Sequence, residues 1–180
     1  MRRALVWGLG ILAGAALVHV AAVAALPYGI MGRVLAGLSA QAGANTFVHP
    51  PLATHESRTV VRPSPDLAYS SAVFDVSEHP LRVTVPLSAP YTSLSGFASN
   101  TDNFFALNDQ TARGDPIDVV IVGPGTQRSG LEGRRVIESP SDRGVLLVRR
   151  VVPSAAEFAG IDAIRRTARA EPLPQAAPSD

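Results

Sequence analysis

The sequence predicts a mainly β protein: a β-sandwich or open barrel of about eight short strands with one C-terminal helix, preceded by a single N-terminal transmembrane helix. Three observations predict it. Residues 4–26 form an uncharged apolar run, proline-punctuated segments rich in β-branched residues follow Asn45, and a helical apolar pattern follows Pro153. The predicted units are a transmembrane helix at 4–26, a juxtamembrane helical linker at 27–45, a β-rich domain at 46–172 and a disordered tail at 173–180.

The first unit is long enough to cross a membrane. Residues 4–26 carry no charged side chain, and Arg2 and Arg3 directly precede them. About 23 helical residues reach across the ~30 Å hydrocarbon core of a bilayer, so a membrane span is predicted. The alternative is a cleaved secretory signal, since residues 22–24 fit an A-x-A cleavage pattern. The uncleaved span is favoured because the apolar core of a signal is usually only ~7–15 residues long.

Basic residues on the two sides of the span predict its orientation. Arg2 and Arg3 flank one side, while the other side offers only Arg33 before Arg58. The positive-inside rule therefore places the N-terminus in the cytoplasm and exports everything after Pro27.

Two further patterns concern helix contacts. Gly10 and Gly14 form a G-x-x-x-G step in the span, which predicts a homodimer through the span or docking on a partner's span. A chance occurrence in an alanine-rich helix is the alternative. Beyond the span, Ile30, Val34 and Leu38 recur at helical spacing and predict a linker helix that packs on the domain or on the membrane. Its end is expected at Gly43.

Short strands are predicted throughout the next unit. The expected strands are 59–62, 69–76, 81–85, 92–98, 103–107, 118–122, 134–138 and 145–152. Apolar and polar residues alternate over 81–85, which predicts one buried face. Residues 119–122 are apolar on both faces, so they are expected in a central strand, which the glycine-proline turn at 123–125 ends.

One helix is predicted after these strands. Pro153 and Ser154 can start it. Its expected buried stripe is Phe158, Ile161 and Ile164, and its expected C-terminal cations are Arg165, Arg166 and Arg169.

Composition excludes several kinds of chemistry. The chain has no cysteine, and all 16 basic residues are arginine, which rules out disulfides, thiol nucleophiles and lysine Schiff bases. The net charge is +1 and the arginines are dispersed, so no nucleic-acid partner is expected. His49, His55 and His79 show no ligand spacing, and neither a metal nor a cofactor is predicted.

Polar residues gather around two of the predicted strands and are the candidate site. They are Asp66, Tyr69, Asp75, Asn100, Asp102 and Arg149. Paired carboxylates can act as acid and base, so a glycosidase-type site is conceivable. The favoured interpretation is structural: Asp and Asn cap turns, and Arg62 or Arg149 braces a strand end by pairing with a carboxylate.

The strand region resembles a known family. The similarity lies in residues 61–71, Asp75, Pro80, residues 83–86, 91–103 and 120–125, and the stretch 139–149. In order and spacing these resemble the family catalogued as domain of unknown function 1254, over roughly residues 62–173. Residues 64–67 read Ser-Pro-Asp-Leu where many members have Asn-x-Asp-Thr. The resemblance implies a β-rich bacterial domain, exported or membrane-anchored, that often accompanies a second β domain, domain of unknown function 1214. It implies no agreed activity.

These observations together predict a protein of the bacterial inner membrane with a periplasmic β-sandwich. The domain is expected to be a binding or assembly module that works with a companion protein. The alternative is an exported hydrolase that acts on an envelope carbohydrate or lipid through the Asp/Asn/Tyr cluster.

Overall fold

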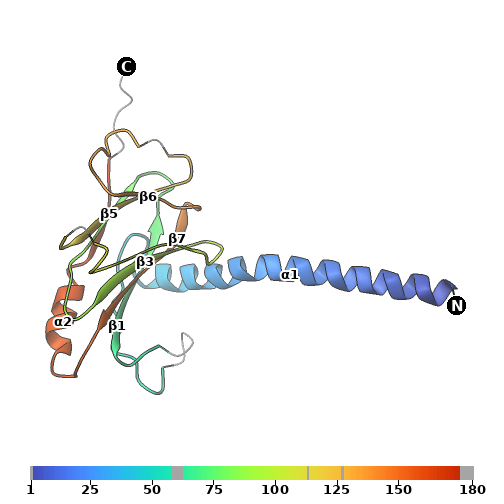
Figure 1. Ribbon diagram of the computed structural model, residues 1–180, viewed down its shortest axis with the longest axis horizontal. Helices are drawn as coiled ribbons and strands as arrows, with labels where there is room; N and C mark the ends of the chain where they lie inside the picture. Colours follow the sequence, from blue (N-terminus) through green and yellow to red (C-terminus); the bar gives the residue numbers. More distant parts are fainter. Residues whose placement is uncertain (1, 58–62, 113, 127, 175–180) are drawn as a thin grey trace.

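The computed structural model describes residues 2–57, 63–112, 114–126 and 128–174 (Figure 1). In chain order the elements are α1 (Arg2–Ala42), β1 (Leu67–Asp75), β2 (Leu81–Val85), β3 (Thr92–Ala98), β4 (Asn103–Asn108), β5 (Ile117–Val122), β6 (Val136–Glu138), β7 (Arg143–Val151), α2 (Phe158–Arg165) and β8 (Arg169–Pro172). The mainly β architecture, with one long apolar helix before the strands and one short helix near the end, is confirmed. The predicted strand at 59–62 and most of the predicted tail lie outside the described residues.

The strands form two four-stranded sheets, in the orders β1-β7-β3-β4 and β6-β5-β2-β8. All pairs are antiparallel except β5 with β6, which is parallel. The sheets enclose one hydrophobic core, and the fold is therefore the predicted sandwich rather than an open barrel. Figure 1 shows α2 beside β1 at one end of the sandwich and α1 extending far from it.

The predicted faces of two strands are confirmed. In β2 the alternate residues Leu81, Val83 and Val85 are buried in the core. In β5, Val119 enters the same core, while Val120 packs with Leu131 in a separate cluster on the other face. β5 is therefore packed against apolar side chains on both of its faces, as expected for a central strand with an apolar run.

The predicted span and the predicted linker form one continuous helix. α1 has 41 residues with Pro27 inside it, and it is the one helix among the described residues that is long and apolar enough to cross a membrane. It ends as predicted at Gly43, whose φ of 75° lies in the left-handed region and whose N–H donates to Ser39 O at 2.8 Å. Met31 is only 6% exposed, whereas Ile30 and Val34 of the predicted stripe are exposed.

The last third of α1 lies on the first sheet. α1 contacts β1 and β7. Four residues of this sheet that point away from the core are buried nonetheless: Val73, Ser93, Ser95 and Val145. The linker is therefore packed on the domain, through the helix face that carries Met31.

The C-terminal helix is shorter than predicted. α2 ends at Arg165, and Arg169 begins β8, which pairs with β2. The expected stripe is wrong at Ile164, which is 37% exposed, while Arg165 is 1% exposed. The reason is that Arg165 turns inward to bond distant carbonyl groups. The predicted strand at 134–138 also shortens to β6, because Arg134 belongs to a turn in which its N–H donates to Leu131 O at 3.2 Å.

Candidate functional site

The sequence-predicted site residues fall at opposite ends of the first sheet. Asp66 directly precedes β1 and Asp75 ends it, so about 30 Å of strand separates them. Glycosidase carboxyl pairs lie roughly 5–10 Å apart. Asp66 and Asp75 therefore do not form an acid–base pair.

The first group lies where β1 ends, and its polar groups bond one another. The Asp75 carboxylate forms an ion pair with Arg143, whose Nε lies 3.1 Å away, and accepts a hydrogen bond from the Ser77 hydroxyl at 2.6 Å. In the turn between β3 and β4, Asn100 Nδ2 donates to Asp102 Oδ2 at 2.6 Å. These contacts cap turns and brace strand ends, although the arginine that pairs with Asp75 is Arg143 rather than Arg149. Arg62, the other predicted partner, lies outside the described residues.

The second group lies where β1 begins. Tyr69 stands directly opposite Arg149 on β7. The Tyr69 hydroxyl accepts a bond from Ser64 N at 2.9 Å, and the Asp66 carbonyl accepts one from Val152 N at 2.8 Å. Arg149 Nε is buried and has no hydrogen-bond partner among the described residues.

Two fully buried arginines near this end were not predicted as site residues. Arg150 is 0% exposed, and its Nη2 donates to Pro86 O at 2.5 Å. Its Nε and Nη1 have no partner in the described part of the chain. Burial, with a smaller contribution from Arg165, lowers the pKa of Arg150 to about 10. Alternation could have identified this residue, since Leu146, Val148 and Arg150 share the inward face of β7.

Arg165, in contrast, has partners for each of its nitrogens. Nη1 donates to Tyr69 O at 2.7 Å, Nη2 to Pro50 O at 2.8 Å, and Nε to Asp162 Oδ1 at 2.5 Å. Its guanidinium also lies 5.4 Å from the centre of the Phe158 ring. Arg165 therefore attaches α2 to β1 and to the segment before it.

His49 lies beside these arginines. Its Nδ1 is 2.8 Å from Ser70 Oγ on β1. Burial lowers the pKa of His49 to about 4, and the neighbouring Arg165 adds to the effect. The imidazole is therefore neutral at physiological pH, which leaves this end of the sandwich cationic.

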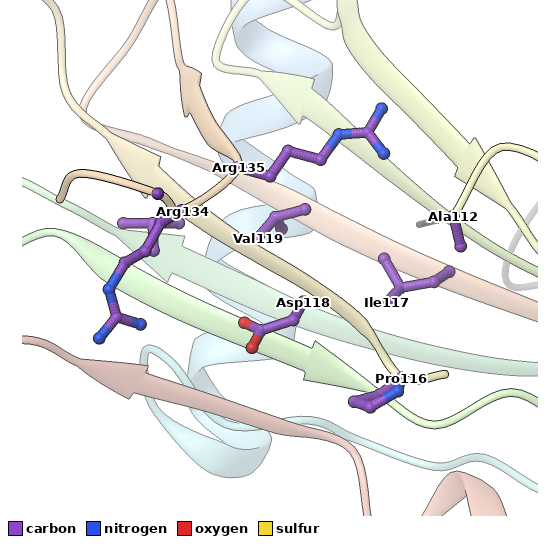
Figure 2. Close-up of a pocket in the computed structure, with 9 residues that line it drawn as sticks. Ala112, Pro116, Ile117, Asp118, Val119, Arg134 and Arg135 are labelled. Atoms are coloured by element: carbon purple, nitrogen blue, oxygen red, sulfur yellow. The ribbon is translucent and has the colours of Figure 1, made fainter. Parts of the chain in front are cut away.

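A pocket of about 270 Å³ lies at the edge of β5 (Figure 2). It exists because β6 pairs only with the last three residues of β5 and leaves the first half of that edge uncovered. The lining residues are Ala112, Pro116, Ile117, Asp118, Val119, Val120, Gly133, Arg134 and Arg135. Sequence reasoning missed this pocket, since its existence depends on where β6 begins.

The charged side chains that line the pocket differ in whether they have a hydrogen-bond partner. Asp118 is held by Arg82 through two bonds, of 3.1 and 2.6 Å, and the first cause of its lowered pKa is this hydrogen bonding. Arg135 Nη1 donates to Thr111 O at 3.1 Å. The guanidinium of Arg134 makes no hydrogen bond or ion pair within the described residues. Figure 2 shows Arg134 and Arg135 extending to different sides of the pocket.

Sequence comparison finds one family. The family model described as "Protein of unknown function (DUF1254)" matches residues 44–172, which confirms the resemblance seen in the strand region. Among curated proteins, no significant match is found.

Two solved structures match this chain, and the first of them has a similar fold. The VPA0106 protein from Vibrio parahaemolyticus matches with a TM-score of 0.61 and 14% identity, over 85% of this chain and 39% of that chain. An uncharacterized protein from Burkholderia cenocepacia matches with a TM-score of 0.49 and 20% identity, over 86% of this chain and 42% of that chain. The chain thus spans about two fifths of the length of the proteins it matches.

Proposed function

The chain belongs to the DUF1254 family of proteins of unknown function, and we propose that it is a membrane-anchored binding or assembly module. In this proposal α1 crosses the bacterial inner membrane with its N-terminus in the cytoplasm, and the sandwich is held in the periplasm. The module works with a companion protein.

The observation that carries the proposal is the continuity of α1 from its apolar end into the sandwich. Trp7 and Tyr28 are 21 positions apart, about 32 Å of helix, which suits aromatic side chains at the two interfaces of a bilayer. Met31, one turn further, is already buried in the protein. A span that continues as one helix into the sandwich fixes the position of the sandwich, whereas a flexible linker would only tether it.

A companion is supported by the length of the structural relative. The fold shared with the Vibrio protein makes up 39% of that chain, so there the sandwich is part of a longer protein. The resemblance to domain of unknown function 1254 implies domain of unknown function 1214 as the companion, and we propose it as the partner. The span offers a second contact, since nothing lies within 4 Å of a side chain added at Gly10 or Gly14, which leaves this face open for a homodimer.

Topology is the first test. A reporter enzyme that is active only outside the cytoplasm, fused after Asp180, is expected to work, and a cytoplasm-only reporter at the same position is expected to fail. The protein is expected to stay with membranes after a carbonate wash. The reverse reporter pattern, or release of a shortened chain that begins near Ala25, would contradict the proposal.

The contact through the span is tested separately. Gly10→Leu and Gly14→Leu are expected to reduce crosslinking between two copies in membranes, because the larger side chain keeps the backbones apart. Gly8→Leu is the matched control, since that position is equally open in the structure. Equal crosslinking in all three variants would remove the dimer from the proposal.

The hydrolase alternative makes a different prediction for the polar residues. A bracing role means that Asp102→Asn lowers the unfolding midpoint, because the Asn100 amide loses its charged acceptor. A catalytic role means that Asp66→Asn and Asp102→Asn leave the midpoint unchanged or raise it. A rise in both variants would favour an enzyme that acts on an envelope carbohydrate or lipid.

A further inference from the structure

We propose that the pocket at the open edge of β5 binds a small organic carboxylate with a short apolar body, whose charged end pairs with Arg134. The proposal is independent of membrane anchoring and of the companion protein. It rests on the exposed edge of the strand, the apolar side of the pocket formed by Pro116 and Ala112, and the distribution of its charges.

The strand edge supplies a hydrogen-bond donor. Val120 N–H donates to Arg135 O at 2.9 Å, toward the β6 side of β5. Because backbone groups two residues apart in a strand point the same way, Asp118 N–H points to that side as well. Pairing between β5 and β6 begins only at Val120, so this N–H faces the pocket instead of a strand. It can donate to one oxygen of a bound carboxylate.

One side of the pocket is apolar. Pro116 and Ala112 line this side and are accessible, whereas the side chains of Ile117, Val119 and Val120 lie behind the pocket surface and are each at most 2% exposed. The volume of about 270 Å³ lies just below the roughly 300–1,000 Å³ of pockets that hold drug-sized ligands. The pocket therefore suits a small apolar group rather than an extended polymer.

The charge of the pocket selects an anion. The one lining carboxylate, Asp118, is already neutralised by its two bonds from Arg82. Two acidic neighbours outside the lining are also engaged: Glu132 accepts a bond from Gly130 N, and Glu138 accepts bonds from Gly125 N and Arg128. Arg134 makes no hydrogen bond or ion pair within the described residues; its charge lies near enough to Asp118 to help lower the pKa of that carboxyl, and its hydrogen-bond donors remain available to a ligand.

The geometry favours a carboxylate over a phosphate. Arg134 and Arg135 extend to different sides of the pocket, so they do not converge on one anion (Figure 2). Arg135 is also held by Thr111 O. A single guanidinium presents a planar fork that matches the two oxygens of a carboxylate. Arg134 is thus the residue that determines specificity for a carboxylate, and Arg135 only lines the wall of the pocket.

The test uses the full chain in detergent micelles with sodium hexanoate, hexanol, acetate and inorganic phosphate as probes. Backbone amide shifts of Asp118, Val119 and Val120 are followed by NMR during titration. Hexanoate is expected to give saturable shifts. Hexanol, which lacks the charge, and acetate, which lacks the apolar body, are expected to bind about tenfold more weakly or worse.

Three variants test the assignment. Arg134→Gln is expected to weaken hexanoate binding about tenfold or more, the effect of losing a charged hydrogen bond. Ala112→Leu narrows the pocket without changing its charge and is expected to weaken binding too. Arg143→Gln, which removes an arginine from the other sheet, is the control and is expected to bind like the parent protein. All variants and the parent protein are measured in the same micelles. Partition of hexanoate into the detergent therefore affects each of them equally and does not change the comparison.

The proposal is overturned by any of three results: no saturable shift with hexanoate, equal binding by Arg134→Gln and the parent protein, or saturable binding of phosphate in preference to hexanoate.

Discussion

Replacing Arg165 by methionine is expected to destabilise the sandwich strongly. Methionine keeps most of the side-chain volume, so the main change is the loss of polar contacts. The substitution removes the donors to Tyr69 O and Pro50 O and the charged partner of Asp162. Groups buried against α2 are then left without a partner.

The magnitude follows from these contacts. Hydrogen bonds to a charged group each contribute about 1.5–3 kcal/mol, and three of them are lost. The variant also no longer has to bury a cation, which offsets part of this loss. Measured costs of removing one member of a buried pair are about 3–5 kcal/mol, and we expect the Arg165→Met value in this range.

The assay is urea unfolding of the full chain in micelles, followed by the β-sheet circular dichroism signal. Arg166→Met is the matched control, because Arg166 is exposed and bonds only Asp162, at 2.8 Å. The control is expected to lose less than about 1 kcal/mol. A loss for Arg165→Met no larger than that of the control would refute the role assigned to Arg165.

Three further outcomes are expected in the same assay. Arg150→Met is expected to leave the free energy of unfolding within about 1 kcal/mol of the parent or to raise it, since the buried Arg150 side chain has one hydrogen bond and no counter-ion among the described residues; a loss above 3 kcal/mol would contradict this. The pKa of His49 is about 4 in the folded protein, against 6.5 for a histidine in the unfolded chain. Between pH 4 and pH 6.5 the unfolded state therefore binds more protons than the folded state. Stability should therefore fall as pH falls from 6.5 to about 4, and His49→Gln should flatten this fall. Gly144→Ala should cost about 1–3 kcal/mol, because the added carbon overlaps Phe97 O and the Phe74 ring; an unchanged midpoint would count against the packing described.

Periodicity predicted most of the fold because the sandwich buries one face of nearly every strand. The alternation in β2 predicted its buried face, and the doubly apolar run in β5 predicted a strand that is covered on both faces. β8 could not be predicted in this way. Its sequence Arg-Ala-Glu-Pro has little strand preference, and pairing with residues 81–84 of β2 holds it in place.

The candidate site was less predictable because it depends on contacts between distant segments. Tyr69 and Arg149 were named as candidates, and the register of β1 and β7 does place them opposite each other. Asp66 and Asp75 lie close in sequence, but an extended strand separates close neighbours by the greatest possible distance. The role of Arg165 depends on the carbonyl groups of Tyr69 and Pro50, which lie 96 and 115 positions away in the sequence. No local sequence pattern predicts such contacts.

The continuity of α1 decides what kind of anchor the proposed span would be. Pro27 removes one helical hydrogen bond and would be expected to kink the helix or end it there, which would leave a flexible joint between the membrane and the sandwich. The helix instead continues for 15 residues, and Met31 is buried one turn after Tyr28, about 4.5 Å along the axis. In the proposed arrangement, with Tyr28 at the interface, a continuous helix would limit the swing of the sandwich and keep it close to the lipid headgroups. A partner would then meet a surface whose orientation is set by the helix, which is the condition an assembly module requires.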